Sequence, residues 1–185
     1  DPTWTSSGSV TSGGSLTTDG TNIYASKGDG DPDIRKYTVA SNTWSNINNF
    51  PTNIGTNSSA TTAKGGLAYV SVGPSGAGEI YGVSGSGVTS AAGIGLIYRY
   101  PVSGTNANTW PTLTGPGTSA PADAPATVSY GGALTSLLNG ASYELYALRG
   151  GATITFWRFV ISDTATGAGA WNAVDPTDLG ATVGS

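Results

Sequence analysis

The segment NIYASKG, residues 22–28, decides the fold, because the chain carries two further versions of it. These are EIYGVSG at residues 79–85 and ELYALRG at residues 144–150. Each version surrounds one tyrosine with apolar or small residues and ends on a glycine, a pattern that favours a short β-strand bounded by a turn. Recurrence over long intervals indicates a repeat protein, so the neighbours of each version should recur as well.

Flanking features do accompany every version. A glycine pair and a short apolar stretch precede it, which predicts an earlier strand. A stretch rich in aromatic residues and then a tryptophan follow it, which predicts a third and a fourth strand. The glycine pairs are Gly13-Gly14, Gly65-Gly66 and Gly131-Gly132, the aromatic stretches are residues 34–39, 97–102 and 156–161, and the tryptophans are Trp44, Trp110 and Trp171.

The chain is therefore predicted to be a single all-β domain, residues 1–185, made of four-stranded antiparallel units. One such sheet cannot bury both of its faces, and radial stacking of copies solves that problem. The recurring aromatics, including Trp4 and the three tryptophans above, are expected to fill the gaps between copies. The predicted units cover approximately residues 13–50, 65–114 and 131–175.

The two ends of the chain match parts of a unit. Residues 1–6 resemble the fourth strand of a preceding unit, since Thr3-Trp4 matches Thr43-Trp44, and residues 180–185 resemble the start of a following one. Radially stacked sheets of this kind form β-propellers, which have about four to eight units, so three units cannot close a ring. We expect further chain or partner subunits to complete the domain.

The order of these features resembles the kelch repeat: a glycine pair, a tyrosine in the second strand and a tryptophan opening the fourth. The resemblance covers nearly the whole chain in three divergent copies. It departs from the kelch pattern because the glycine pair that ends the second strand survives only as Gly150-Gly151. The resemblance implies a β-propeller, and that fold implies no single function.

Composition excludes several classes of function. The chain has neither cysteine nor histidine, which removes thiol chemistry, the Ser-His-Asp triad and the commonest zinc ligands. Charged residues make up 10% and the net charge is −4, so no basic surface for nucleic acid is expected. No apolar run approaches a membrane-spanning length of roughly 20 residues. The polar, uncharged composition suits a secreted and processed protein at or outside the cell surface.

The best metal candidate is the acidic run of Asp29, Asp31 and Asp33, predicted to lie in the loop between the second and third strands. Alternating carboxylates could ligate Ca²⁺, although the run lacks the spacing of an EF-hand and a solvated turn is the favoured alternative. No other cofactor is predicted. Asn57, in the sequence Asn-Ser-Ser, is the candidate for glycosylation.

Three cations, Lys36, Arg99 and Arg158, hold one position in the three predicted third strands and are flanked by aromatic residues. Such a cation could bind a sugar or a carboxylate, or it could stack between neighbouring units. Recurrence favours the packing role, because a repeated position usually serves a repeated packing need.

Three functions follow from these observations. We favour a non-catalytic structural module of an extracellular or cell-surface assembly, an oligomer or filament completed by strand exchange with copies of itself or by the rest of a longer chain. The alternative is a carbohydrate-binding or adhesive propeller. Catalysis by Glu79, Glu144 or Asp163 ranks last, because Glu79 and Glu144 hold equivalent repeat positions.

Overall fold

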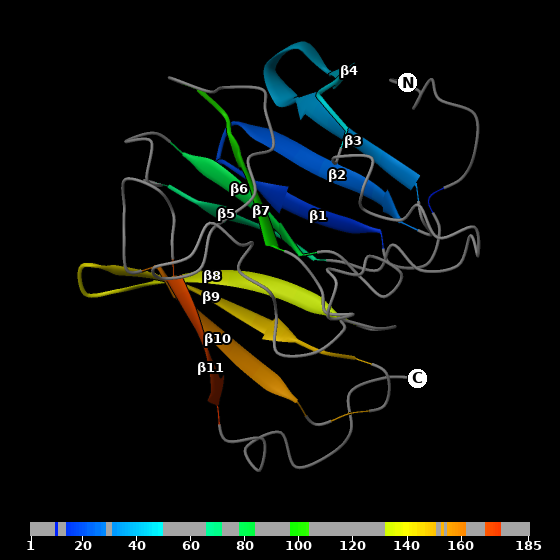
Figure 1. Cartoon of the computed structure of the whole chain (residues 1–185). Coiled ribbons are helices and arrows are strands. Elements are labelled where there is room, and N and C mark those ends of the chain that lie inside the picture. The colour runs from blue at the N-terminus through cyan, green and yellow to red at the C-terminus, as the bar shows by residue number, and fades with distance from the viewer. Residues whose placement is uncertain are drawn as a thin grey trace.

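A computed structural model describes the part of the chain that forms the sheets (Figure 1). All its regular elements are strands, apart from the short 3₁₀ turn Val39–Ser41. The predicted all-β class with antiparallel sheets is therefore confirmed. The described residues are 10, 14–28, 31–49, 66–71, 78–83, 97–103, 132–150, 153, 155–161 and 169–174.

Within these residues the strands form three antiparallel meanders, which we call sheets 1, 2 and 3. Sheet 1 contains β1 (Ser15–Thr18), β2 (Asn22–Gly28), β3 (Asp31–Thr38) and β4 (Thr43–Asn46). Sheet 2 contains β5 (Leu67–Val70), β6 (Glu79–Val83) and β7 (Ile97–Pro101). Sheet 3 contains β8 (Ala133–Asn139), β9 (Ser142–Leu148), β10 (Phe156–Ile161) and β11 (Gly169–Val174).

Two local predictions in sheet 1 were wrong. The acidic run was expected in a loop, but Asp31 and Asp33 belong to β3, because a register shift between Ser26 and Gly28 lets Gly28 pair with Asp31. The third strand was expected to reach Val39, but it ends at Thr38. A 3₁₀ turn follows it and closes on Asn42, whose φ of 53° suits the left-handed conformation that asparagine tolerates.

Strand register makes the three sheets equivalent position by position. Each repeat tyrosine pairs with a cation on the next strand: Tyr24 with Lys36, Tyr81 with Arg99 and Tyr146 with Arg158. A leucine on the first strand pairs with the residue after each tyrosine: Leu16 with Ala25, Leu67 with Gly82 and Leu134 with Ala147. Successive strand residues point to opposite faces, so tyrosine and leucine mark opposite sides of each sheet.

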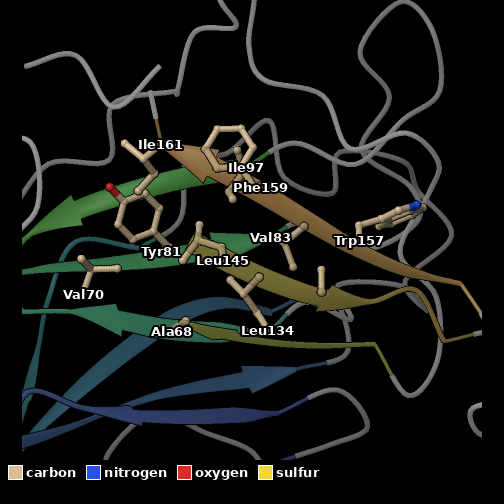
Figure 2. Packing of buried hydrophobic residues seen from close by; sticks show 11 residues of the cluster. Ala68, Val70, Tyr81, Val83, Ile97, Leu134, Leu145, Trp157, Phe159 and Ile161 are labelled. Atoms are coloured by element: carbon tan, nitrogen blue, oxygen red, sulfur yellow. The ribbon is translucent and has the colours of Figure 1, made fainter. Parts of the chain in front are cut away.

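We call these sides the tyrosine face, which carries Tyr24, Tyr81 or Tyr146, and the leucine face, which carries Leu16, Leu67 or Leu134. Two apolar clusters fill the spaces between sheets. The first joins Tyr24 of sheet 1 to Leu67 of sheet 2. The second joins Tyr81 of sheet 2 to Leu134 of sheet 3, and Figure 2 shows its side chains. Each tyrosine face therefore packs on the leucine face of the next sheet.

The first strands of the sheets lie next to one another, β1 beside β5 and β5 beside β8. The backbone N–H of Leu67 donates to Ser15 Oγ at 2.9 Å, and Ser136 Oγ donates to the carbonyl oxygen of Tyr69. Gly66 allows a close approach, because a Cβ there would lie 2.3 Å from the backbone nitrogen of Leu134. The sheets thus fan out from adjoining first strands (Figure 1).

Candidate functional site

The buried polar group of sheet 2 consists of Glu79, Tyr81 and Arg99. Glu79 is fully buried, and its two carboxylate oxygens accept from Tyr81 Oη and pair with Arg99 Nη1, both at 3.0 Å. Burial, and then the neighbouring Glu79 carboxylate, raise the pKa of Tyr81. A buried carboxylate needs such partners, because leaving it unpaired in the core is costly.

Sheet 3 repeats the arrangement in a more open setting. Tyr146 Oη donates to Glu144 Oε2 at 2.6 Å, Asn139 Nδ2 donates to Glu144 Oε1 at 3.3 Å, and Arg158 Nη1 lies 3.8 Å from the same Oε1. The hydrogen bond to Glu144, and then burial, raise the pKa of Tyr146. The Arg158 side chain is 39% exposed, against 11% for Arg99.

In sheet 1 different residues form the hydrogen-bonded group around the repeat tyrosine. Asn22 stands where the other sheets have glutamate, and Asp19 in the preceding turn supplies the carboxylate. Asp19 Oδ2 accepts from Tyr24 Oη at 2.8 Å and from Asn22 Nδ2 at 3.0 Å. Burial acts to raise the pKa of Asp19, but hydrogen bonds from Asn22, Thr21 and Tyr24 outweigh it and lower the pKa. Burial and Asp19 raise the pKa of Tyr24.

In sheets 2 and 3 these groups explain the recurring glutamate and arginine by contacts within the sheet. Sequence reasoning treated Glu79 and Glu144 as weak catalytic candidates and Arg99 and Arg158 as candidates for ligand or inter-sheet contacts. It missed that they pair with one another, and it missed Asp19. The signal was available, since glutamate and arginine recur together in the second and third copies and are both replaced in the first. A ligand role for Lys36, Arg99 and Arg158 stays a prediction.

The leucine face of sheet 1 has no sheet against it among the described residues. Leu16 is 69% exposed there, whereas Leu67 at the same position of sheet 2 is 3% exposed. Val39, in the 3₁₀ turn that follows β3, is also exposed, although its equivalent Ile161 in β10 is buried. A half-open cavity of about 330 Å³ lies on this face, and its lining includes Leu16, Ala25 and Trp44.

The tyrosine face of sheet 3 is the matching outer surface at the other end of the stack. Leu137 is 51% exposed there, whereas Val70, its equivalent in sheet 2, is 2% exposed. Phe156 is partly exposed, although its equivalents Ile34 and Ile97 are buried. Both ends of the stack therefore expose positions that are covered between the sheets.

The structure describes only some of the other residues that the sequence singled out. Asp33 Oδ1 accepts from Asn49 Nδ2 at 3.0 Å, and Asp33 Oδ2 lies 3.5 Å from Arg35 Nη2. Asp29 and the side chain of Asp31 lie outside the described residues, as do Asn57, Asp163, Trp4 and Trp110. Over the described ranges, no three acidic residues gather to hold a metal ion.

The described part of the chain forms no helix that is long and apolar enough to cross a membrane.

Among the described residues, the fourth-strand tryptophans Trp44 and Trp171 hold equivalent positions and pack on aromatic rings. The ring of Trp44 lies 5.1 Å from that of Tyr37, and the ring of Trp171 lies 5.2 Å from that of Phe159. Register pairs Trp44 with Tyr37 and Trp171 with Phe159, so the contact is the same in both sheets. Aromatic pairs at such distances stabilise sheets in addition to the area that they bury.

Comparison with known proteins shows the fold alone. No protein-family model and no curated protein matches the chain. Among solved structures 35 chains match, one of them described as the structure of YjhT, with a TM-score of 0.52 and 12% sequence identity. The match covers 89% of this chain and 52% of the YjhT chain. This chain therefore spans about half the length of that structure.

Proposed function

We propose that this chain is a non-catalytic structural module of an extracellular or cell-surface assembly, and that its sheets are blades of a kelch-like β-propeller. Support for the propeller comes from three meandering sheets that stack in one sense with their first strands adjoining. Radial stacking of this kind is how propellers bury both faces of each blade. The polar, weakly charged composition supports the extracellular location.

One observation carries the structural role: equivalent positions are buried between sheets and exposed at the two outer faces. Leu16 and Leu137 are both large and apolar, and both are more than half exposed. The equivalent side chains in the middle sheet, Leu67 and Val70 of sheet 2, are core residues. Large apolar side chains exposed at positions that are buried in sheet 2 favour cover of both outer faces by further β-sheets.

Negative-stain microscopy of the purified chain tests this proposal. We expect closed rings or filaments, because each copy leaves one face of each kind for a further copy. The copies form a ring if the rotation between them closes, and a filament if it does not. Isolated particles the size of one chain, at every concentration examined, would contradict the structural role.

The cavity on the leucine face of sheet 1 supports a second candidate, carbohydrate binding or adhesion. Trp44 contributes to its lining, and aromatic side chains with a few polar groups are typical of small-ligand sites. Most of the lining residues are apolar, and the hydroxyls of Ser15 and Ser26 already accept from the backbone N–H groups of Leu67 and Ser15. A glycan array probed with and without calcium tests this candidate together with the acidic run. Binding that is lost in Trp44→Ala would support it, and an array without hits would oppose it.

A further inference from the structure

We infer that the tyrosine face of sheet 3 binds the leucine face of sheet 1 on a second copy of this chain. The inference rests on the proposed structural role and names its partner and its two surfaces. Inside the chain, each of the two contacts between sheets joins a tyrosine face to a leucine face. The two faces left at the ends are one of each kind. The second copy therefore repeats a contact that this chain already makes twice.

Equivalent residues show what the new contact would bury. Between sheets 1 and 2, Ile34 of the tyrosine face shares a cluster with Leu67 of the leucine face. Phe156 holds the position of Ile34 in sheet 3, and Leu16 holds the position of Leu67 in sheet 1. Contact between two copies thus sets Phe156 against the region of Leu16.

The cavity beside Leu16 has the size and chemistry for that contact. Its volume is about 330 Å³, and Val10, Leu16, Ala25 and Trp44 are among the residues that line it. A cavity of about 150 Å³ is enough to hold a benzene ring in a protein interior. The larger Phe156 side chain in place of Ile34 is accordingly no obstacle to docking.

Charge does not oppose the contact. The tyrosine face of sheet 3 carries Glu144 and Arg158, which form an ion pair with each other. On the leucine face of sheet 1, Arg35 is buried and lies 3.5 Å from Asp33. Each surface therefore presents paired charges, and the chain as a whole has a net charge of only −4. Apolar burial can then drive association.

The contact allows two kinds of assembly. Two copies joined through two identical contacts of this kind form a closed ring, whereas a rotation that does not close produces a filament. The contact between the copies is the same in both cases.

The inner contacts also predict which atoms meet. Ser15, just before Leu16, lies against Leu67 of the next sheet, with the Leu67 N–H donating to its Oγ. Gly66, just before Leu67, lies against Leu134 of the next sheet, where a Cβ on Gly66 would be 2.7 Å from the Leu134 Cβ. Ala133, just before Leu134, is equivalent to Ser15 and Gly66. It should therefore lie against Leu16 of the second copy.

Disulfide trapping tests this pair directly, because the chain has no cysteine of its own. Two single variants, Leu16→Cys and Ala133→Cys, are mixed and oxidised, and the products are separated without reductant. Both positions are exposed, so folding should persist, as a circular dichroism spectrum checks. We expect a covalent dimer, since a disulfide forms when the Cβ atoms approach to roughly 4 Å.

Leu138→Cys mixed with Leu16→Cys is the matched control, because Leu138 is about as exposed but lies on the leucine face of sheet 3. It should trap only at background level. Equal trapping by Leu138 and Ala133, or none by either while the wild-type chain is oligomeric, overturns the proposed contact and leaves the structural role standing. A wild-type chain that stays monomeric at all concentrations removes the structural role as well.

Discussion

The glutamate, tyrosine and arginine of sheet 2 and those of sheet 3 are the same residues in the same register, and they differ in what covers them. Glu79, Tyr81 and Arg99 are sealed by the apolar cluster against sheet 3. Glu144 is buried too, but Arg158 and Tyr146 lie on an outer face and are partly exposed. Burial of the tyrosine and the arginine therefore depends on the next sheet, whereas Glu144 is buried without one. The exposure of Tyr146 and Arg158 reports whether a further sheet is present.

The largest expected effect comes from removing the inner cation. Arg99→Met leaves the Glu79 carboxylate buried without its ion pair, which should reduce the free energy of unfolding by about 3–5 kcal/mol. Arg158→Met, the matched change on the outer face, should cost less than about 1 kcal/mol in the monomer. Urea unfolding of both variants measures the difference. Equal losses would mean that burial does not distinguish the two groups.

Truncating the equivalent leucines should separate inner from outer faces by packing alone. Leu67→Ala opens a cavity between sheets 1 and 2 and should cost about 2–5 kcal/mol. Leu16→Ala should cost less than about 0.5 kcal/mol in dilute monomer, because Leu16 is 69% exposed. In the assembled protein Leu16→Ala should instead weaken association. Thermal unfolding at low and high protein concentration distinguishes these effects.

Removing one hydroxyl should have a smaller effect in the same direction. Tyr81→Phe deprives buried Glu79 of a hydrogen bond and should cost about 1–3 kcal/mol. Tyr146→Phe leaves Glu144 with two partners, Asn139 and the partly exposed Arg158. The loss in free energy of unfolding should therefore be about 1 kcal/mol or less. Urea midpoints compare the two. A larger loss for Tyr146→Phe in dilute solution would contradict the difference in burial.

The buried tyrosines should make stability depend on pH only under alkaline conditions. Burial raises the pKa of Tyr100 from 10.0 to about 12, and the pKa values of Tyr24 and Tyr81 are raised as well. The unfolded chain loses these protons near pH 10 and the folded chain does not, so stability should be constant below that pH and fall above it. Unfolding measured from neutral to about pH 11 checks the slope. Tyr100→Phe should make the fall less steep.

Much of the fold could be predicted because one pattern sets the register. The tyrosine at residues 24, 81 and 146 marks the second strand of each sheet, and the aromatic stretches beyond it form the third strands. The all-β class and antiparallel sheets follow from period-two alternation around these positions. The end of β3 at Thr38 could not be read from that pattern, because the 3₁₀ turn depends on local backbone geometry at Asn42.

The polar groups were harder to predict than the strands. Glu79 and Arg99 are 20 residues apart, and only the register of β6 against β7 brings them together. One-residue slips reverse the face of every side chain, so pairing across strands needs the register first. The sense of stacking was not available either, because both faces of each sheet are partly apolar. The calcium, glycan and ligand hypotheses for Asp29, Asn57 and Lys36 stay predictions.

The central claim is that a second copy covers the exposed outer faces, and the molar mass of the native chain in solution tests it most directly. Light scattering on the eluting peak across a range of concentrations should give the mass of two or more chains of 18.4 kDa each. Leu137→Glu, which places a charge on the tyrosine face of sheet 3, should return the mass to that of one chain without loss of the β-sheet spectrum. A wild-type mass of 18.4 kDa at every concentration would contradict the claim.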